Sequence, residues 1–289
     1  MSHDKRRRLK AALAAGPLVT APGVFDMISA LLADRLDFPA LYMTGYGTVA
    51  SHLGLPDAGL ATYSDMVSRV ATMAARTRTP LIADADTGYG GLLNVATTVR
   101  GYEAAGAAGI QLEDQEFPKK CGHTPGRRCI PLQEMVDKVR VAVEARTDPD
   151  FLIVARTDAR TEYGLDDALA RARAYAAAGA DVIFVESPES IAEMEAVCRA
   201  IDKPTLVNMV EGGRTPLLSK AEMIRIGFRV AIFPTAPFLA ATQALDTLYR
   251  ALKETGATTN PPVPLYPFAE MNKLMGFEAV WDFDRRHAR

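Results

Sequence analysis

The stretch LIADADTGYGG, residues 81–91, joins a short apolar run to two carboxylates and a glycine-rich turn. The apolar run has the length of a buried strand, and the turn ends it. Because side chains alternate along a strand, Asp84 and Asp86 are predicted to lie on the same side. Two like charges at the end of a buried strand repel each other and need a counter-charge. The stretch therefore predicts a strand that carries a polar site at its carboxyl end.

Seven further apolar segments of this kind recur, separated by stretches with helical periodicity such as LDDALARARAYAAAGA. The eight predicted strands lie within residues 17–23, 40–47, 80–88, 109–115, 151–159, 181–188, 204–213 and 230–237. Strands that alternate with helices form a parallel sheet covered by helices. Eight units in 289 residues favour a closed (β/α)8 barrel, the TIM barrel, over an open doubly wound sheet. No GxGxxG sequence follows the first strand, which weakens the dinucleotide-binding alternative.

The chain shows no linker or shift in composition, so residues 1–289 are predicted to form one domain. Its start, MSHDKRRRLKAALAAGPL, is too weakly apolar for a signal peptide and predicts an amphipathic first helix. From about residue 250 to 289, a proline-rich arm precedes a predicted amphipathic helix with Met271, Leu274, Phe277 and Trp281 on one side. That helix packs either on its own barrel or on a neighbouring subunit, and the sequence leaves both open.

Composition excludes several classes of function. A net charge of −2 gives no electrostatic basis for binding nucleic acid or an anionic membrane. No apolar run approaches the roughly 18 residues of a membrane span. Cys121, Cys129 and Cys198 are too few and too scattered for a disulfide framework, which favours the cytoplasm.

Charged and polar residues gather at the carboxyl ends of the predicted strands, where barrel enzymes build their active sites. They are Asp84, Asp86, Glu113, Asp114, Arg156, Asp158, Glu186, Asn208 and Glu211. Carboxylates converging there would repel one another and raise one another's pKa values. A divalent cation resolves this conflict, and oxygen ligands without a His or Cys cluster favour Mg²⁺ or Mn²⁺. The alternative is that the acids cap loops or pair with Arg156.

The segment KKCGH, residues 119–123, follows the fourth predicted strand. Cys121 lies beside two lysines and His123, so its thiol pKa is predicted to be lowered and the thiol to be available for proton transfer. Gly122 and the following TPGRR suggest a mobile lid. The alternative is an incidental loop cysteine. Asp57, in GLPDAG, could contact a metal through water or cap the next helix.

Taken together, these motifs resemble the isocitrate lyase/phosphoenolpyruvate mutase superfamily over nearly the whole chain. The motifs that carry the resemblance are GLPD, DADTGYGG, LEDQ, KKCGH, ARTDA and NMVEGGRTP. The resemblance implies a (β/α)8 barrel whose C-terminal helix is exchanged between subunits of a homotetramer. It also implies a Mg²⁺-dependent carbon–carbon lyase, because KKCGH is the lyase signature.

The resemblance also implies roles for individual residues. Asp84 and Asp86 would hold Mg²⁺, with Glu113 and Asp57 in the water-mediated shell. Tyr42 matches the proposed base for the hydroxyl proton, and Cys121 the general acid. The residues implied to bind the substrate are Thr44, Gly45, Tyr46, Gly122, His123, Arg156, Glu186, Asn208 and Glu211.

The implied substrate is a small 2-hydroxy carboxylic acid cleaved to an α-keto acid such as pyruvate plus a carboxylic acid. Methylisocitrate lyases carry two further arginines at positions that align with Leu239 and Phe268. Apolar side chains there remove the bidentate partner of an extra carboxylate. This, with NMVEGGRTP, favours 2,3-dimethylmalate or another 2-alkylmalate, as in the branch of 2,3-dimethylmalate lyases and petal death proteins. The alternatives are methylisocitrate cleavage, oxaloacetate hydrolysis or decarboxylation, a phosphonomutase, and a binding barrel without catalysis.

Overall fold

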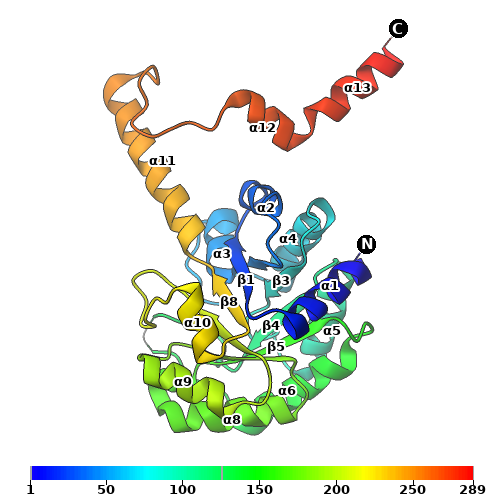
Figure 1. Ribbon diagram of the computed structural model, residues 1–289, viewed down its shortest axis with the longest axis vertical. Coiled ribbons are helices and arrows are strands. Elements are labelled where there is room, and N and C mark those ends of the chain that lie inside the picture. The colour runs from blue at the N-terminus through cyan, green and yellow to red at the C-terminus, as the bar shows by residue number, and fades with distance from the viewer. Residues whose placement is uncertain (1, 125, 289) are drawn as a thin grey trace. The chain divides into compact units, whose positions relative to one another are not determined.

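The structure, a computed structural model, describes residues 2–124 and 126–288. Within them, eight parallel strands close into a barrel in sequence order. The strands are β1 (Val19–Val24), β2 (Leu41–Met43), β3 (Leu81–Asp84), β4 (Gly109–Glu113), β5 (Leu152–Thr157), β6 (Val182–Val185), β7 (Thr205–Asn208) and β8 (Val230–Phe233). Each falls within one of the eight predicted segments or extends one residue beyond it, so the predicted (β/α)8 barrel is confirmed (Figure 1).

Helices surround the strands (Figure 1). In the first half of the chain they are α1 (Ser2–Ala15), α2 (Met27–Asp34), α3 (Gly45–Leu53), α4 (Tyr63–Arg76), α5 (Leu92–Ala104) and α6 (Leu132–Ala145). In the second half they are α7 (Ala159–Tyr163), α8 (Leu165–Ala177), α9 (Ile191–Ala200) and α10 (Lys220–Ile226). Three further helices follow β8 along the chain: α11 (Ala236–Thr255), α12 (Phe268–Met275) and α13 (Phe277–His287).

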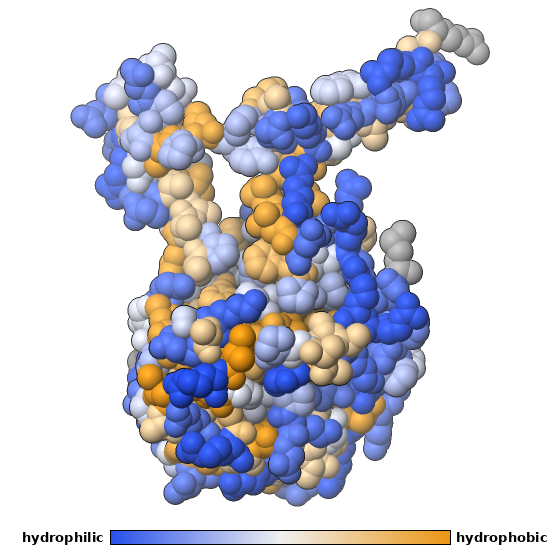
Figure 2. All heavy atoms as spheres, viewed as in Figure 1, coloured by the Kyte–Doolittle hydropathy of each residue, from blue (hydrophilic) through white to orange (hydrophobic). Residues whose placement is uncertain are grey.

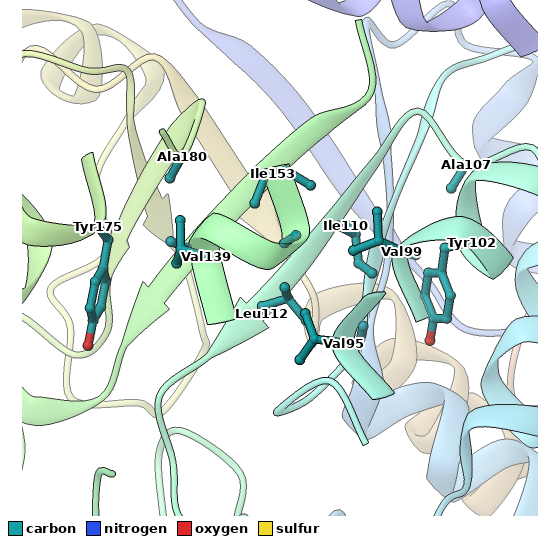
Figure 3. Packing of buried hydrophobic residues seen from close by; sticks show 14 of the residues in the cluster. Val95, Val99, Tyr102, Ala107, Ile110, Leu112, Val139, Ile153, Tyr175 and Ala180 are labelled. Carbon is teal, nitrogen blue, oxygen red and sulfur yellow. The ribbon is translucent and has the colours of Figure 1, made fainter. Parts of the chain in front are cut away.

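The strands bury both of their faces. Outward residues such as Ile110, Leu112 and Ile153 pack against helix residues, among them Val99 and Val139 (Figure 3). The inward set forms a second cluster inside the barrel, made of Val19, Ala21, Tyr42, Ile82, Val154, Phe184, Leu206 and Ile232, among others. This two-sided burial explains why the strands read as continuous apolar runs in the sequence.

Helix α1 is the amphipathic first helix that the sequence predicts. Leu9 and Leu13 join the cluster inside the barrel. Lys5 and Arg6 are also buried, and they donate hydrogen bonds to the carbonyl oxygens of Ala74 (2.7 Å) and Ala107 (3.0 Å). The helix therefore covers the amino-terminal end of the barrel with apolar side chains and is held there by buried cations.

The chain divides into two compact units, Met1–Phe238 and Leu239–Arg289. The prediction of one domain over residues 1–289, with residues 250–289 packing on a neighbouring subunit, stays a prediction. Within the second unit, the single predicted amphipathic helix is wrong. Gly276, at φ 84°, ends α12 and precedes α13, because a left-handed glycine terminates a helix. Leu274 is buried, whereas Phe277 and Trp281 are exposed.

The surface agrees with the ordinary composition of the chain. On the face shown in Figure 2, hydrophilic side chains cover most of the barrel unit and apolar ones are scattered among them. Among the described residues, no helix combines the length and hydropathy needed to cross a membrane.

Candidate active site

The carboxyl ends of the strands bring polar side chains from five strands to one place. Parallel register aligns Asp84 with Gln111 and Glu113 with Arg156 on neighbouring strands. The cluster also receives side chains from the loops that follow the strands. Its members, all at most 8% exposed, are Asp57, Asp84, Asp86, Glu113, Arg156, Glu186 and Asn208.

Asp84 and Asp86 lie together, as the sequence predicts: the backbone N–H of Asp86 donates to Oδ1 of Asp84 at 3.0 Å. Lys119 is the counter-ion of this group. Its Nζ lies 2.6 Å from Oδ1 of Asp86 and also contacts Oδ1 of Asp57. Burial nevertheless raises the pKa of Asp86 to about 6. The charges of Asp84 and Asp57 also raise this pKa, whereas the charge of Lys119 lowers it. The acids therefore remain short of positive charge.

Glu113 completes the acidic group. Its Oε2 lies 3.5 Å from Nε of Arg156, and burial raises its pKa well above the ordinary value. Its other oxygen, Oε1, is buried and has no hydrogen-bond partner among the described residues. An orphaned acceptor beside ionisable carboxylates fits a site that receives a cation and the water around it.

The donor set of this acidic group suits Mg²⁺ or Mn²⁺, because all of its ligands are hard oxygens. Among the described residues, His3, Asp148 and Asp150 also form a group whose possible ligand atoms lie within 4.8 Å of one another. That group lies outside the cluster at the barrel end. Ionic contacts to Arg6 and Lys10 already neutralise that group. At the barrel end, one or two carboxylates would bind the ion directly and other oxygens would complete its shell, as Mg²⁺ prefers.

Arg156 faces this acidic group from β5. Its Nε and Nη2 donate to both oxygens of Asp158, at 2.9 and 2.8 Å. The same Nη2 lies 3.4 Å from Oε2 of Glu186, and the guanidinium lies over the ring of Phe184 at 5.1 Å. A planar guanidinium fixed in this way can bind a carboxylate on its remaining edge.

Glu186 is held at the end of β6 by neighbours on three sides. Nδ2 of Asn208 donates to its Oε2 at 3.0 Å, and the backbone N–H of Ser187 donates to its Oε1 at 2.7 Å. Nε2 of His123 lies 3.5 Å from the same Oε1, and burial lowers the pKa of this histidine. His123 therefore contributes a neutral ring near pH 7.

The Cys121 segment packs directly on this cluster. The backbone N–H of Cys121 donates to the carbonyl of Asp57 at 3.1 Å, and Ser187 Oγ donates to the carbonyl of Gly122 at 3.2 Å. A Cβ at Gly122 would lie 2.1 Å from Nη2 of Arg156, so glycine is required there. Pro125, in the predicted lid, lies outside the described residues, and the lid stays a prediction.

The predicted lowering of the Cys121 pKa is wrong. Burial raises the pKa of this thiol. Its two lysine neighbours are also committed elsewhere, because Lys119 contacts Asp57 and Asp86 and Lys120 donates to the carbonyl of Gly126 at 3.0 Å. A thiol that keeps its proton at neutral pH is suited to act as an acid rather than as a nucleophile.

Residues of β2 and the start of α3 line the cluster from the other side. Tyr42 Oη donates to Oε1 of Gln111 at 3.0 Å, and burial with nearby Asp84 holds the pKa of this phenol well above its ordinary value. Thr44 is buried, and a Cβ at Gly45 would lie 2.6 Å from Oδ2 of Asp84. The segment therefore approaches the acids through its backbone.

Two predicted substrate-binding residues lie outside the buried cluster. Tyr46 is 39% exposed, and its ring packs edge-on against Phe238 at 5.7 Å. Glu211 is exposed and accepts a hydrogen bond from Thr235 at 2.9 Å. Their predicted roles stay predictions.

Asp114 is not part of the cluster, contrary to the expectation from its position. It follows Glu113, so alternation turns it towards α8, where it accepts hydrogen bonds from Tyr175 (2.7 Å) and Arg171 (3.3 Å). It also accepts the backbone N–H of Asp158 at 2.9 Å. Nor does Asp57 cap the next helix, because Thr62 caps α4.

Three buried residues of the site carried no signal as ligands or partners in the sequence. Lys119 was expected only as a neighbour of the thiol, Arg127 as part of a lid, and Gln111 not at all. Gln111 is buried inside the barrel, and its Nε2 has no partner among the described residues. The sequence did offer one signal for Gln111: it lies two positions before Glu113 on the same predicted strand, so both side chains face the inside of the barrel.

Comparison with known proteins agrees with this geometry. A family model described as phosphoenolpyruvate phosphomutase matches residues 9–253. The chain is 49% identical over 281 residues to 2,3-dimethylmalate lyase of Eubacterium barkeri, covering 97% of both chains. It is 42% identical over 271 residues to 2-methylisocitrate lyase of Aeropyrum pernix, covering 94% of this chain and 86% of the relative.

Solved structures show the same fold. A crystal structure of 2,3-dimethylmalate lyase, described as a PEP mutase/isocitrate lyase superfamily member, matches with a TM-score of 0.91 at 36% identity, over 98% of this chain and 95% of the other. Oxaloacetate acetylhydrolase with 3,3-difluorooxalacetate matches with 0.91 at 35% identity, over 98% and 97%. Phosphonopyruvate hydrolase with oxalate and Mg²⁺ matches with 0.89 at 29% identity, over 99% of both chains.

Proposed function

The chain belongs to the phosphoenolpyruvate phosphomutase family, within the PEP mutase/isocitrate lyase superfamily, and is an enzyme of the lyase type; we propose that it cleaves the C2–C3 bond of a 2-alkylmalate. The substrate would be 2,3-dimethylmalate or a close analogue. The products would be an α-keto acid such as pyruvate and a carboxylic acid. The reaction would depend on Mg²⁺, with Mn²⁺ as the alternative ion.

The observation that carries this proposal is a half-buried thiol placed beside the carboxylate cluster, on a segment whose backbone N–H donates to Asp57. Cleaving C2–C3 leaves an enolate-like fragment that must receive a proton at carbon. The raised pKa of Cys121 keeps a proton available, and Gly122 holds the segment against Arg156. A phosphonomutase needs no such donor.

The residues of the chain divide the remaining work. Asp84 and Asp86 would hold Mg²⁺, with Glu113 and Asp57 reaching it through water. When bound there, Mg²⁺ supplies a Lewis acid that polarises a carbon–oxygen bond. Arg156 binds one substrate carboxylate.

Protons and electrons balance with two groups. Tyr42 would receive the proton of the C2 hydroxyl as the phenolate, and the electrons of that O–H bond would form the C=O of the keto acid. Because burial and the nearby acids raise the pKa of this phenol, the role requires the positive charges of Arg156 and of Mg²⁺, when bound, to favour the phenolate. The electrons of the C2–C3 bond pass to the departing fragment. Cys121 then gives its proton to C3, and the final transfer from Tyr42 back to Cys121, through solvent, restores the enzyme.

Two features support an alkylmalate over a tricarboxylate. The relative at 49% identity is named for 2,3-dimethylmalate. The resemblance also aligns Leu239, and less securely Phe268, with two arginines of methylisocitrate lyases, and apolar side chains there do not pair with a third carboxylate. Methylisocitrate is the second candidate, supported by the 42% identical relative, and oxaloacetate hydrolysis is the third, supported by the structural match to oxaloacetate acetylhydrolase.

The test is a substrate panel. Purified protein is incubated with 2,3-dimethylmalate, other 2-alkylmalates, methylisocitrate, oxaloacetate and phosphonopyruvate, with Mg²⁺ or with EDTA, and keto-acid formation is followed. Mg²⁺-dependent release of pyruvate from an alkylmalate, faster than from methylisocitrate, is expected. Turnover of phosphonopyruvate alone, or of none of these acids, would contradict the proposal.

The protein is further proposed to act as a homotetramer in the cytoplasm. Exposed apolar side chains along the C-terminal helices, among them Leu245, Tyr249, Phe268 and Trp281, support an assembly. The three cysteines are free thiols, which supports a reducing compartment. Sedimentation of the purified protein would test the tetramer.

A further inference from the structure

Two adjacent arginines that follow the Cys121 segment have opposite environments. The side chain of Arg128 is 77% exposed and pairs with Glu116 at the surface, at 2.8 Å. The side chain of Arg127 is fully buried. A buried guanidinium is costly unless specific partners compensate it, so the contacts of Arg127 call for an explanation.

Those contacts lead to the residue that holds Arg156. Nη1 of Arg127 donates to Oδ1 of Asp158 at 2.6 Å, and Nη2 donates to Oγ1 of Thr161 at 2.5 Å. Asp158 follows β5 directly and Thr161 belongs to α7. Asp158 is itself fixed, because its backbone N–H donates to Asp114.

Both arginines share one oxygen of Asp158. Nη2 of Arg156 donates to the same Oδ1 at 2.8 Å. Arg156 and Asp158 alone carry one positive and one negative charge, which cancel. With Arg127 the group of three has a net charge of +1. Because a carboxylate shared between two cations holds each one less tightly, Arg127 weakens the hold of Asp158 on Arg156.

The site makes this compensation necessary. Glu113 lies 3.5 Å and Glu186 3.4 Å from nitrogens of Arg156, so three carboxylates compete for one guanidinium. Lys119 and the proposed Mg²⁺ offset the acids around Asp86, but an anion that approaches Arg156 still meets these three carboxylates. Arg127 supplies further positive charge from behind Asp158, out of reach of solvent.

We propose that Arg127 is a positioning residue that keeps Arg156 available to a carboxylate of the substrate. It does not touch the substrate; it acts through Asp158. The inference rests on the proposed role of Arg156 as the carboxylate-binding residue. The ligand class is a small dicarboxylate, and the effect of Arg127 falls on binding more than on the chemical step.

The experiment compares Arg127→Met with two controls. Arg128→Met removes the same charge from the neighbouring, exposed position. Thr161→Ala removes the second anchor of Arg127 without touching Asp158. The dissociation constant of oxalate is measured by calorimetry with Mg²⁺ present, and KM and kcat are measured with the best alkylmalate.

Arg127→Met should raise the dissociation constant of oxalate and the KM by about 10- to 100-fold, because Asp158 would then hold Arg156 more tightly and the ligand would lose the equivalent of one hydrogen bond from that guanidinium. The change in kcat should be smaller. Arg127→Lys should recover part of the affinity, because it restores the charge without the planar fork. Both controls should match the wild type.

Unchanged oxalate affinity and KM in a folded Arg127→Met protein would overturn the inference, even if its melting temperature fell. Should that variant not fold, Arg127→Lys carries the test, and a wild-type affinity in the lysine variant overturns the inference as well. The proposed function fails separately: wild type that binds oxalate but forms no keto acid refutes the lyase proposal and leaves the binding comparison decisive. Wild type that does neither refutes both.

Discussion

Replacing Asp86 with asparagine should stabilise the metal-free protein at neutral pH. Burial, the strongest cause, raises the pKa of Asp86 from 3.8 to about 6, even with Lys119 only 2.6 Å away. At about 1.4 kcal/mol for each tenfold change, the ionised side chain destabilises the fold by about 3 kcal/mol. Asparagine keeps the shape, loses the charge and tolerates the φ of 49° at this position.

The sign of the pH dependence follows from the two states. The pKa of Asp86 is higher in the folded protein than in the unfolded chain, so the folded protein binds the proton more tightly. The contribution of Asp86 to the free energy of unfolding therefore rises as the pH falls from about 7 towards 4. Above about pH 7 the side chain is ionised and destabilises the fold by the full amount. Asp86→Asn should remove this part of the slope.

The assay is urea unfolding with EDTA between about pH 5 and pH 8. The variant should exceed the wild type by up to about 3 kcal/mol at pH 8 and by about half as much near pH 5. Excess Mg²⁺ should stabilise the wild type more than the variant, because Asp86 is a proposed ligand. Asp202→Asn, at an exposed position, is the matched control. A variant no more stable than the wild type at pH 8 would refute the reasoning.

Three further substitutions test the site. Cys121→Ala should lower keto-acid formation from alkylmalates by about 10²- to 10⁴-fold while oxaloacetate decarboxylation, measured in parallel, is largely kept. Gly122→Ala should raise KM in the same assay, because its Cβ would lie 2.1 Å from Nη2 of Arg156, whereas Gly91→Ala, with nothing within 4 Å, should not. Leu239→Arg should shift relative kcat/KM towards tricarboxylates in a folded protein; an unchanged ratio would count against the position inferred from the resemblance.

The barrel could be predicted because its signals are local. Each strand is an apolar run short enough to recognise, and Gly106 and Gly179, at φ 97° and 108°, follow the helices that precede β4 and β6. The break at Gly276 was missed for a related reason. Apolar residues keep a helical spacing across it, and periodicity outweighed the single glycine.

The acids of the site were predictable because charge inside a buried strand is conspicuous. The residues that pair with these acids could not be predicted, because their contacts join positions far apart in the sequence. Lys119 meets Asp57 across 62 positions of the chain, and a lysine in a polar loop resembles a surface residue. The thiol pKa was predicted with the wrong sign because the sequence shows neighbouring charges but not burial, and burial dominates the pKa of Cys121.

The position of α1 has a practical consequence for handling the protein. Leu9 and Leu13 cover the amino-terminal opening of the barrel. Buried Lys5 and Arg6 anchor α1 there through hydrogen bonds to the carbonyl oxygens of Ala74 and Ala107. A shortened protein that begins at β1 would lack these side chains and would expose apolar residues inside the barrel to water. Expression designs should therefore keep the first fifteen residues and separate any amino-terminal purification tag from them by a flexible spacer.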